Sequence, residues 1–248
     1  MSKKTALLDL DGTLLPMDID EFLKGYFKLL TKEFSGIFPA EDFINNLMYA
    51  TNRMIKNNGD RTNSEVFIEE FFNLYQVDNQ EEIMRMFEVF YQEKFPLLKS
   101  QINHDGIASR LIEVLKKDGY QLVLATNPIF PLEAIEERLR WVDITPEDFS
   151  LISNYENMHY CKPNIEYYQE IIDLLDVNID DCIMIGNDVQ EDMIAGELGM
   201  QTYLVTDFLI DRRNKDFSSE FSEVELVSEK INIDWQGTLK ELLNHFEN

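Results

Sequence analysis

The stretch TALLDLDGTLL, residues 5 to 15, sets two aspartates, Asp9 and Asp11, directly after a run of apolar residues. A short apolar run of this kind is typical of a buried β-strand. Carboxylates are rarely buried without a partner or a metal ion, so they mark the place where the strand leaves the interior. Gly12 permits an abrupt turn there. We therefore expect a strand that ends at Asp9 and presents both carboxylates to a crevice.

Further along the chain, similar apolar runs alternate with stretches of helical periodicity. The predicted strands are 5–10, 121–127, 149–154, 182–187 and 201–205, and the predicted helices between the later strands are 107–118, 131–140, 164–175 and 189–198. Strands that alternate with helices are typical of a parallel sheet with helices on both faces, so the sequence predicts an α/β fold. A closing helix is predicted at 235–246, whereas residues 207–235 show no clear pattern.

The segment 17–99 has a different pattern. Its apolar residues recur every three or four positions, which predicts four amphipathic helices and no strand. Eleven of the 17 phenylalanines of the chain lie in it, which is enough for a hydrophobic core of its own. We expect an inserted all-α helical bundle at 17–99, with residues 1–16 and 100–248 forming the α/β core.

The charge of the chain limits its partners. Its 248 residues include 47 Asp and Glu but only 22 Lys and Arg, for a formal net charge of -25. Such a surface repels nucleic-acid backbones and anionic lipid, so neither nucleic acid nor a membrane is expected as a partner. Two cysteines are too few for a disulfide framework, and no apolar window approaches the length of a membrane span or a signal-peptide core. We expect a cytoplasmic protein.

Polar residues gather where the predicted strands end. In an open parallel sheet, ligands bind outside the carboxyl ends of the strands. The residues at these ends, or shortly after them, are Asp9, Asp11, Thr126, Asn127, Lys162, Asn187 and Asp188. Mg²⁺ is commonly held by one or two carboxylates and keeps its other positions for water and phosphate. The set therefore predicts a site for Mg²⁺ and a phosphoryl group, with one aspartate as nucleophile and a second as acid and base.

Four short motifs, in this order, carry a resemblance to a known family. They are DLDGTL at 9–14, ATN at 125–127, KP at 162–163 and GNDVQED at 186–192. Together they resemble the motifs of the haloacid dehalogenase superfamily of phosphohydrolases, over residues 5 to about 206. The resemblance implies a Rossmann-like core. The helical insertion after the first motif resembles the cap domain of one branch of that superfamily.

The resemblance also implies a role for each matching residue. Asp9 would attack phosphorus and become an aspartyl phosphate, and Asp11 would protonate the leaving group and then activate water. Thr126, with Asn127 beside it, would bind the phosphoryl oxygens. Lys162 would neutralise charge on these oxygens and on Asp9. Mg²⁺ would be held by the Asp9 carboxylate, the Asp11 backbone carbonyl and a side chain of the fourth motif, so catalysis would be mostly positioning and electrostatics.

The fourth motif departs from the family pattern. The family commonly has Asp directly after the motif glycine, whereas this chain has Asn187 there and Asp188 next. Either side-chain oxygen can reach a metal, so both are candidate ligands. Asp188 with Glu191 also matches a helix N-cap and its partner, a pattern that needs no metal. Asp192, four residues after Asp188, is expected to orient the metal ligand or Lys162.

Several other polar residues have a simpler explanation. Cys161 is expected to be a packing residue, and His104 and His159 to be structural or exposed. Three basic residues surround the KNNGD stretch at 56–60 and suit either an anionic substrate or a solvated loop between helices. They are Arg53, Lys56 and Arg61.

The motifs together predict a Mg²⁺-dependent phosphatase that hydrolyses a small-molecule phosphate monoester through an aspartyl phosphate, with the helical cap closing over the site. A dehalogenase is disfavoured, because Asp11 offers acid-base chemistry that halide displacement does not need. The alternatives are a phosphonate hydrolase with a Schiff-base lysine in the cap, a phosphomutase, and a non-catalytic regulatory protein that binds phosphate or metal. The cap lysines considered for the phosphonate hydrolase are Lys24, Lys28 and Lys56.

Overall fold

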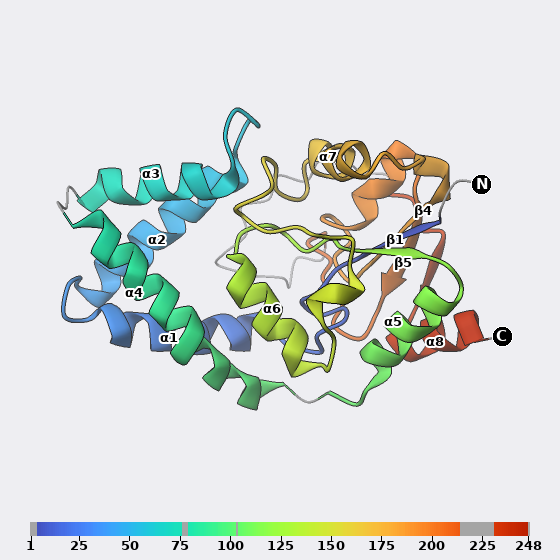
Figure 1. The fold of residues 1–248 in the computed structure, drawn as a ribbon, viewed down its shortest axis with the longest axis horizontal. Coiled ribbons are helices and arrows are strands. Elements are labelled where there is room, and N and C mark those ends of the chain that lie inside the picture. Colours follow the sequence, from blue (N-terminus) through green and yellow to red (C-terminus); the bar gives the residue numbers. More distant parts are fainter. Residues whose placement is uncertain (1–3, 76–78, 103, 214–230, 248) are drawn as a thin grey trace.

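The structure, a computed structural model, describes residues 4–75, 79–102, 104–213 and 231–247. Its centre is a six-stranded, fully parallel sheet with the order β3-β2-β1-β4-β5-β6 (Figure 1). The strands are β1 (Thr5–Leu8), β2 (Gln121–Leu124), β3 (Leu151–Ile152), β4 (Cys182–Gly186), β5 (Gln201–Val205) and β6 (Trp235–Gly237). The predicted α/β fold with a parallel sheet is confirmed.

Helices follow the strands in the predicted order. The α-helices are α1 (Ile19–Phe34), α2 (Ala40–Ile55), α3 (Asn63–Tyr75), α4 (Gln80–Glu93), α5 (Ile107–Lys117), α6 (Leu132–Trp141), α7 (Ile165–Leu175) and α8 (Leu239–Glu247). Short 3₁₀ helices are η1 (Phe95–Gln101), η2 (Pro146–Asp148), η3 (Ile179–Asp181) and η4 (Met193–Leu198). Among the described residues, none of these helices is long and apolar enough to cross a bilayer.

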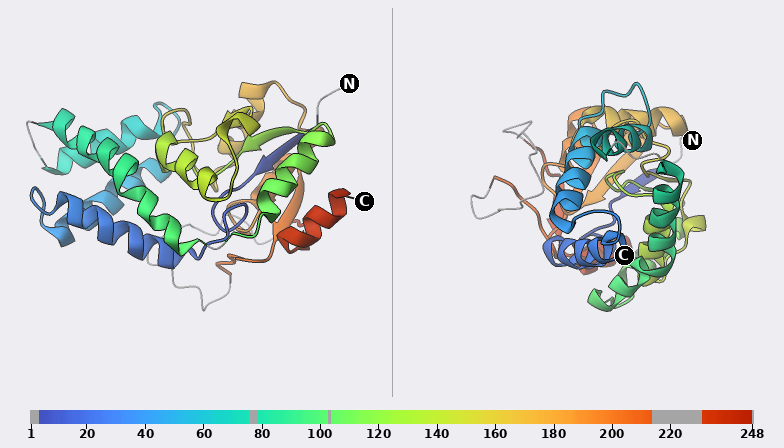
Figure 2. Two further views of the ribbon diagram at one scale, coloured as in Figure 1. Left: turned by 60° about the horizontal axis from the view of Figure 1, so that its bottom comes forward. Right: turned by 90° about the vertical axis from the view of Figure 1, so that its left-hand side faces the viewer.

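Both faces of the sheet are covered. Successive residues of a strand point to opposite faces. Leu7 of β1 accordingly packs in one apolar cluster with Tyr167 of α7, and its neighbour Leu8 packs in another with Leu111 of α5 and Leu242 of α8. The helices α5 and α8 lie together on one side of the strands, and α7 lies on the other (Figure 2). The two faces are thus buried as the sequence predicts.

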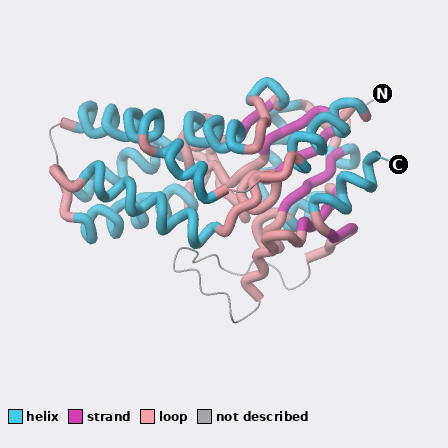
Figure 3. Tube along the Cα trace, turned by 90° about the horizontal axis from the view of Figure 1, so that it is seen from below, coloured by secondary structure: helices cyan, strands magenta, loops and turns pink. Residues whose placement is uncertain are grey.

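The helices α1 to α4 lie together at the end of the molecule away from both termini (Figures 1 and 3). Their apolar stripes meet in an aromatic cluster. The ring of Phe34 lies 4.5 Å from that of Phe87 and 4.9 Å from that of Phe43, measured between centroids. Ring pairs at this spacing pack favourably. The predicted helical cap, with four helices and no described strand, is therefore present.

The aromatic cluster of the cap is continuous with the core of the sheet domain. Phe95 of η1 stacks on Trp141 of α6 with ring centroids 5.5 Å apart, and Phe22 of α1 approaches the same indole at 6.5 Å. All three side chains are buried and belong to one apolar cluster with β1. The cap therefore shares its core with α6. The domain boundaries after residues 16 and 99 stay predictions.

Two predicted helices differ from the structure. The segment 189–198 is a turn followed by the 3₁₀ helix η4, because the side chain of Asp192 turns inward to other partners and Gly199, at φ +101, ends the segment. The segment 235–246 begins as β6, whose residues pair with β5. Its helix starts only at Leu239, where Thr238 and Glu241 form a reciprocal capping box.

Candidate active site

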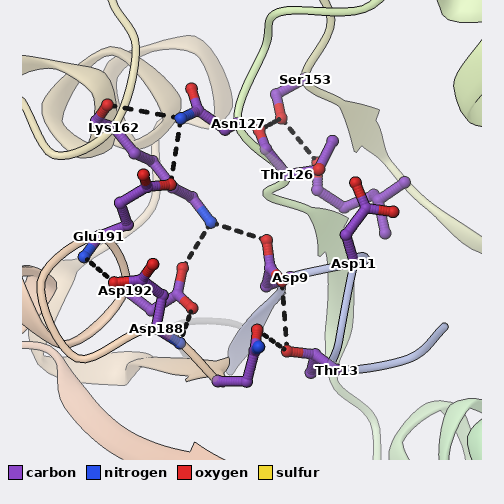
Figure 4. A network of polar contacts seen from close by, with 12 residues as sticks. Asp9, Asp11, Thr13, Thr126, Asn127, Ser153, Lys162, Asp188, Glu191 and Asp192 are labelled. Atoms are coloured by element: carbon purple, nitrogen blue, oxygen red, sulfur yellow. Dashed lines mark hydrogen bonds and ion pairs between the residues drawn. The ribbon is translucent and has the colours of Figure 1, made fainter. Parts of the chain in front are cut away.

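The carboxyl ends of β1, β2 and β4 open into one cavity of about 190 Å³ between the sheet and the cap. Leu8 of β1 is in register with Leu124 of β2 and Ile185 of β4, so the residues that follow these strands meet at the same level. Every predicted site residue lines this cavity: Asp9, Asp11, Thr126, Asn127, Lys162, Asn187, Asp188 and Asp192. Figure 4 shows most of them converging.

Lys162 links the first motif to the fourth. Its ammonium nitrogen Nζ lies 3.0 Å from Asp9 Oδ1 and 2.6 Å from Asp192 Oδ1 (Figure 4). Only 1% of the lysine is exposed. Burial alone lowers the pKa of an amine, but the carboxylates of Asp192 and Asp9 outweigh it and hold the pKa of Lys162 well above its usual value. The lysine is therefore a fixed positive charge beside Asp9.

Thr13 joins Asp9 to Asn187. The Thr13 hydroxyl lies 3.2 Å from Asp9 Oδ2 and 3.0 Å from Asn187 Oδ1. The Asn187 amide nitrogen donates to the Phe208 carbonyl at 2.6 Å, which fixes its oxygen toward Thr13. Gly12 makes this approach possible: its φ is +83, and a Cβ there would lie 2.3 Å from Asn187 Nδ2. Two oxygens, one from each motif, thus converge on the same hydroxyl.

Asp188 is held by protein groups. Its Oδ1 accepts hydrogen bonds from the backbone N–H groups of Gln190 and Glu191, both at 2.9 Å. Arg212 donates to both carboxylate oxygens, at 2.6 Å for Oδ1, and also to Glu191 at 3.0 Å. The N-cap half of the predicted capping box is therefore formed. The Glu191 side chain instead binds Arg212 and Asn127.

Asp192 orients this loop. Its Oδ2 accepts from the Asp188 backbone N–H at 2.9 Å, while its Oδ1 accepts from Lys162. Gly186 leaves room for it, since a Cβ at Gly186 would lie 2.1 Å from Asp192 Oδ2. The sequence predicted that Asp192 orients the metal ligand or Lys162; its carboxylate contacts Lys162 and the Asp188 backbone, and the segment between the two aspartates is a turn and not a helix.

Asp11 pairs with Arg138 of α6. The guanidinium is fully buried, lies 4.5 Å above the ring of Phe130 and also donates to the Ala134 carbonyl at 3.2 Å. Burial raises the pKa of Asp11, and the neighbouring Arg138 opposes that shift. Asp11 Oδ1 has no hydrogen-bond partner within the described part of the chain. One carboxyl oxygen is thus anchored, and the other is buried without a protein partner.

Thr126 and Asn127 follow β2. The Thr126 carbonyl accepts from the hydroxyls of Ser153 at 2.7 Å and Tyr167 at 2.9 Å, which fixes the backbone at this strand end. The Asn127 amide nitrogen donates to Glu191 Oε2 at 3.0 Å. Its Oδ1 is buried and has no partner among the described residues. Both residues border the cavity.

The oxygen atoms at the strand ends suit a hard cation. Within the described ranges, no three His, Cys, Asp or Glu side chains form a group that could hold a metal. A metal site here therefore depends on an amide or backbone oxygen as well as on carboxylates. Asp9 Oδ2 and Asn187 Oδ1, which meet at Thr13, are such a pair, and oxygen ligands are those that Mg²⁺ prefers. The donor set thus fits Mg²⁺.

Of the three basic residues of the cap named from the sequence, Arg53, Lys56 and Arg61, one lies at the cavity. Lys56 lines the cavity. Arg53 pairs with Glu70 and Arg61 with Glu69, and both arginines are about half exposed on the cap surface. Lys24 and Lys28 are also exposed and do not line the cavity.

Three further side chains lie away from this cavity. His104 pairs with Asp143 at 3.3 Å, and His159 Nδ1 lies 2.6 Å from Glu170 Oε1. Cys161 is buried in an apolar cluster with Met54. These contacts agree with the structural roles expected for the two histidines and the cysteine.

Three residues of the site were not predicted: Thr13, Arg138 and Arg212. The sequence carried a signal for Arg138. It lies four residues after Ala134 and three after Ile135, so the helical period places it on the buried face of its helix. A charged residue on an apolar face needs a buried partner. The sequence carried no such signal for Arg212, because this residue lies in a stretch without clear periodicity. It reaches the site because Ile210 bonds to the backbone beside Asp188.

Comparisons with known proteins agree with this geometry. A family model described as haloacid dehalogenase-like hydrolase matches residues 3–198. Pyrophosphatase PpaX of Bacillus mycoides is 23% identical over 213 residues, covering 83% of this chain and 85% of PpaX. YfnB from Bacillus subtilis, solved bound to magnesium, shares the fold with a TM-score of 0.55 at 19% identity over 100% of both chains. A haloacid dehalogenase-type (HAD) phosphatase from Thermococcus onnurineus also shares the fold, with a TM-score of 0.54 at 20% identity, over 98% of this chain and 97% of that one.

The family match spans most of the chain and contains all four motifs in order. It confirms the resemblance found in the sequence, and the helical insertion after the first motif is seen in the structure. The chain belongs to the haloacid dehalogenase-like hydrolases, as a member with a helical cap.

Proposed function

We propose that this chain is a Mg²⁺-dependent phosphatase that hydrolyses a small-molecule phosphate monoester through an aspartyl phosphate on Asp9. The observation that carries the proposal is the contact of Lys162 Nζ with Asp9 Oδ1 at 3.0 Å inside the cavity. A nucleophile that approaches an anionic phosphoryl group needs local positive charge, most of all in so acidic a chain. The likeness to the pyrophosphatase PpaX and to the phosphatase from Thermococcus onnurineus supports the reaction class.

The proposed reaction has two steps. First, an Asp9 carboxylate oxygen bonds to phosphorus while the ester oxygen leaves with a proton from Asp11. Second, a water oxygen attacks the same phosphorus and passes its proton to Asp11, inorganic phosphate leaves, and the Asp9 carboxylate is restored. The arrangement of Asp11 supports its role: Arg138 anchors one oxygen, and the other has no partner among the described residues at the cavity. Lys162 and Thr126 would bind the phosphoryl oxygens, with Asn127 next to them.

Mg²⁺ is the proposed cofactor. Its proposed ligands are the Asp9 carboxylate, the Asp11 backbone carbonyl and Asn187 Oδ1. We favour Asn187 over Asp188 because both Asp188 oxygens already bond to Arg212 and one also accepts two backbone N–H groups. When bound, the ion would supply positive charge to the phosphoryl oxygens and help to hold Asp9 ionised. The magnesium named for YfnB supports the choice of metal.

The cap at 17–99 is proposed to close over the core formed by 1–16 and 100–248. Leu23 of α1, Ile55 of α2 and Lys56 directly after α2 line the cavity with the core residues, which supports a part for the cap in choosing the leaving group. Lys56 is also the cap lysine that supports the alternative of a phosphonate hydrolase.

The proposed partner is a small phosphorylated molecule, and neither nucleic acid nor a membrane. The net charge of -25 supports this choice. A reducing, cytoplasmic location is proposed because Cys161 and Cys182 are both buried free thiols.

The test is a panel of phosphate monoesters, inorganic pyrophosphate and phosphonoacetaldehyde, incubated with purified protein and Mg²⁺ while inorganic phosphate is measured. We expect release from at least one monoester, its loss on chelation and its recovery when Mg²⁺ is restored. Absence of release from every compound contradicts the proposal. Two further readouts separate the alternatives: borohydride trapping on Lys56 indicates a phosphonate hydrolase, and a rearranged phosphate ester indicates a mutase.

A further inference from the structure

A second cavity lies beside the proposed catalytic one. Its volume is about 120 Å³, and it shares four lining residues with the catalytic cavity: Leu23, Ile55, Ile129 and Phe130. Both the cap and the core form its walls. We call this cavity the apolar chamber. Because the two cavities share a wall, a molecule bound at Asp9 has the chamber next to it.

The walls of the chamber are hydrophobic. Six of its lining residues are Leu47, Met48, Phe67, Met84, Phe87 and Tyr155. None of the described residues that line it is charged. The hydroxyls of Tyr26 and Tyr91 bond to each other at 2.9 Å, and that of Thr51 donates to the Leu47 carbonyl at 2.9 Å. Three of the four hydroxyls that the described residues place in the wall, those other than Tyr155, therefore have partners, so a polar group placed there would regain few of the hydrogen bonds that it makes to water.

We infer that the apolar chamber receives the leaving group of the substrate, and that the substrate is a phosphate monoester of an apolar alcohol with about five or six carbons beyond the one that bears the ester oxygen. This inference rests on the proposed phosphatase function. The chamber's size sets this limit, because an apolar protein cavity of about 150 Å³ holds one benzene molecule and the chamber, at about 120 Å³, is slightly smaller. The two methionines in the wall make it adaptable to ring or chain.

The arrangement of the two cavities gives the chamber its selectivity. The phosphoryl group would lie among Asp9, Thr126 and Lys162, and the ester oxygen would lie near Asp11. Ile129 and Phe130 come two and three residues after the second motif and form the core side of the shared wall, so the alcohol would extend past them under the cap. Each methylene buried in the chamber is worth up to about fourfold in kcat/KM. A polar alcohol of similar length gains no such increase in kcat/KM.

The test compares benzyl phosphate with glycerol 3-phosphate, two esters of primary alcohols, in the presence of Mg²⁺. We expect kcat/KM to be at least about tenfold higher for benzyl phosphate. The variant Met48→Trp fills the chamber and should reduce that ratio by at least about tenfold. Tyr49→Trp adds the same ring to the exposed face of the same helix and should leave the ratio unchanged. Equal kcat/KM for the two esters, or preference for glycerol 3-phosphate, overturns the inference.

A binding measurement keeps this inference separate from the proposed reaction. Benzyl alcohol, titrated into the full chain and followed by ligand-observed NMR, should bind to the wild type and to Tyr49→Trp and not to Met48→Trp. Binding without hydrolysis of any ester would contradict the phosphatase and keep the apolar chamber as a binding site. Hydrolysis without binding or preference would contradict the chamber's role and keep the phosphatase.

Discussion

The guanidinium of Arg138 binds Asp11 across 127 positions of sequence, with the arginine fully buried. The contact joins the helix that follows β2 to the motif that follows β1. It anchors one oxygen of the carboxyl group proposed as acid and base, while the other oxygen is buried without a hydrogen-bond partner among the described residues. Because an unpaired buried charge is costly, the two residues depend on each other.

Replacing Arg138 with Met should therefore be strongly destabilising. We expect the free energy of unfolding to fall by about 3 to 5 kcal/mol, because Asp11 is left without its partner. Urea unfolding followed by circular dichroism measures the change. Arg140→Met, on the exposed face of the same helix, should cost less than about 1 kcal/mol. The double variant Asp11→Asn, Arg138→Met should recover part of the unfolding free energy that Arg138→Met loses. If the double variant instead loses the sum of the losses of the two single variants, the two residues are not coupled.

Gly12→Ala should impair the site more than the backbone conformation alone explains. Gly12 and Gly119 have nearly the same φ, +83 and +82, but a Cβ at Gly12 meets Asn187 at 2.3 Å, whereas one at Gly119 meets nothing within 4 Å. Gly119→Ala should cost about 1 to 2 kcal/mol through the positive φ. Gly12→Ala should cost more and also reduce kcat. Equal losses of unfolding free energy, with unchanged kcat, would show that the contact with Asn187 is unimportant.

The third metal ligand can be assigned by two substitutions. If Asn187 Oδ1 is the ligand, Asn187→Ala should raise the Mg²⁺ dissociation constant by about tenfold or more. Asp188→Asn should change it by less, because Asp188 is held by Arg212 and by backbone N–H groups. Isothermal titration with Mg²⁺ gives both values without relying on activity. A larger effect from Asp188→Asn would assign the ligand to Asp188.

Asn63 should hold the cap against the core. It is fully buried, its side chain donates to the carbonyls of Pro128 and Tyr160 at 3.3 Å, and its backbone N–H donates to Met158 at 2.9 Å. Asn63→Ala should cost about 1 to 3 kcal/mol and speed amide exchange at residues 155–161. Asn58→Ala, in the exposed turn between α2 and α3, should change stability by less than about 0.5 kcal/mol. Unchanged exchange in Asn63→Ala would contradict the docking role.

The sequence was sufficient where a local pattern determines the structure. Apolar runs that end in Asp9, Thr126 and Asn187 predicted the parallel α/β core and the crevice, because parallel strands carry their next residues to one edge. The helices of the cap followed from their period of three to four. The third strand was overestimated: only Leu151–Ile152 pair with β2, and both are only partly buried.

Tertiary contacts decided what the local pattern could not. At 189–198 the apolar spacing suggested a helix, but Asp192 binds Lys162 and the Asp188 backbone, and these contacts define a turn. At 235–237 the residues pair with the sheet edge. Arg212 reaches Asp188 from a stretch in which the described residue Ile210 forms a backbone bridge to the fourth motif. Of the segment 207–235, which had no predicted structure, residues 214–230 lie outside the described residues.

The most direct test of the account is the rate of phosphate release by Asp9→Asn against the wild type, with Mg²⁺ and the best ester of the panel. The substitution keeps the size of the side chain and an oxygen that can accept from Lys162, but removes the nucleophilic carboxylate. We expect kcat to fall on the order of 10⁴-fold with an unchanged circular dichroism spectrum. Turnover within about tenfold of the wild type would contradict the assignment of Asp9 as the residue that attacks phosphorus.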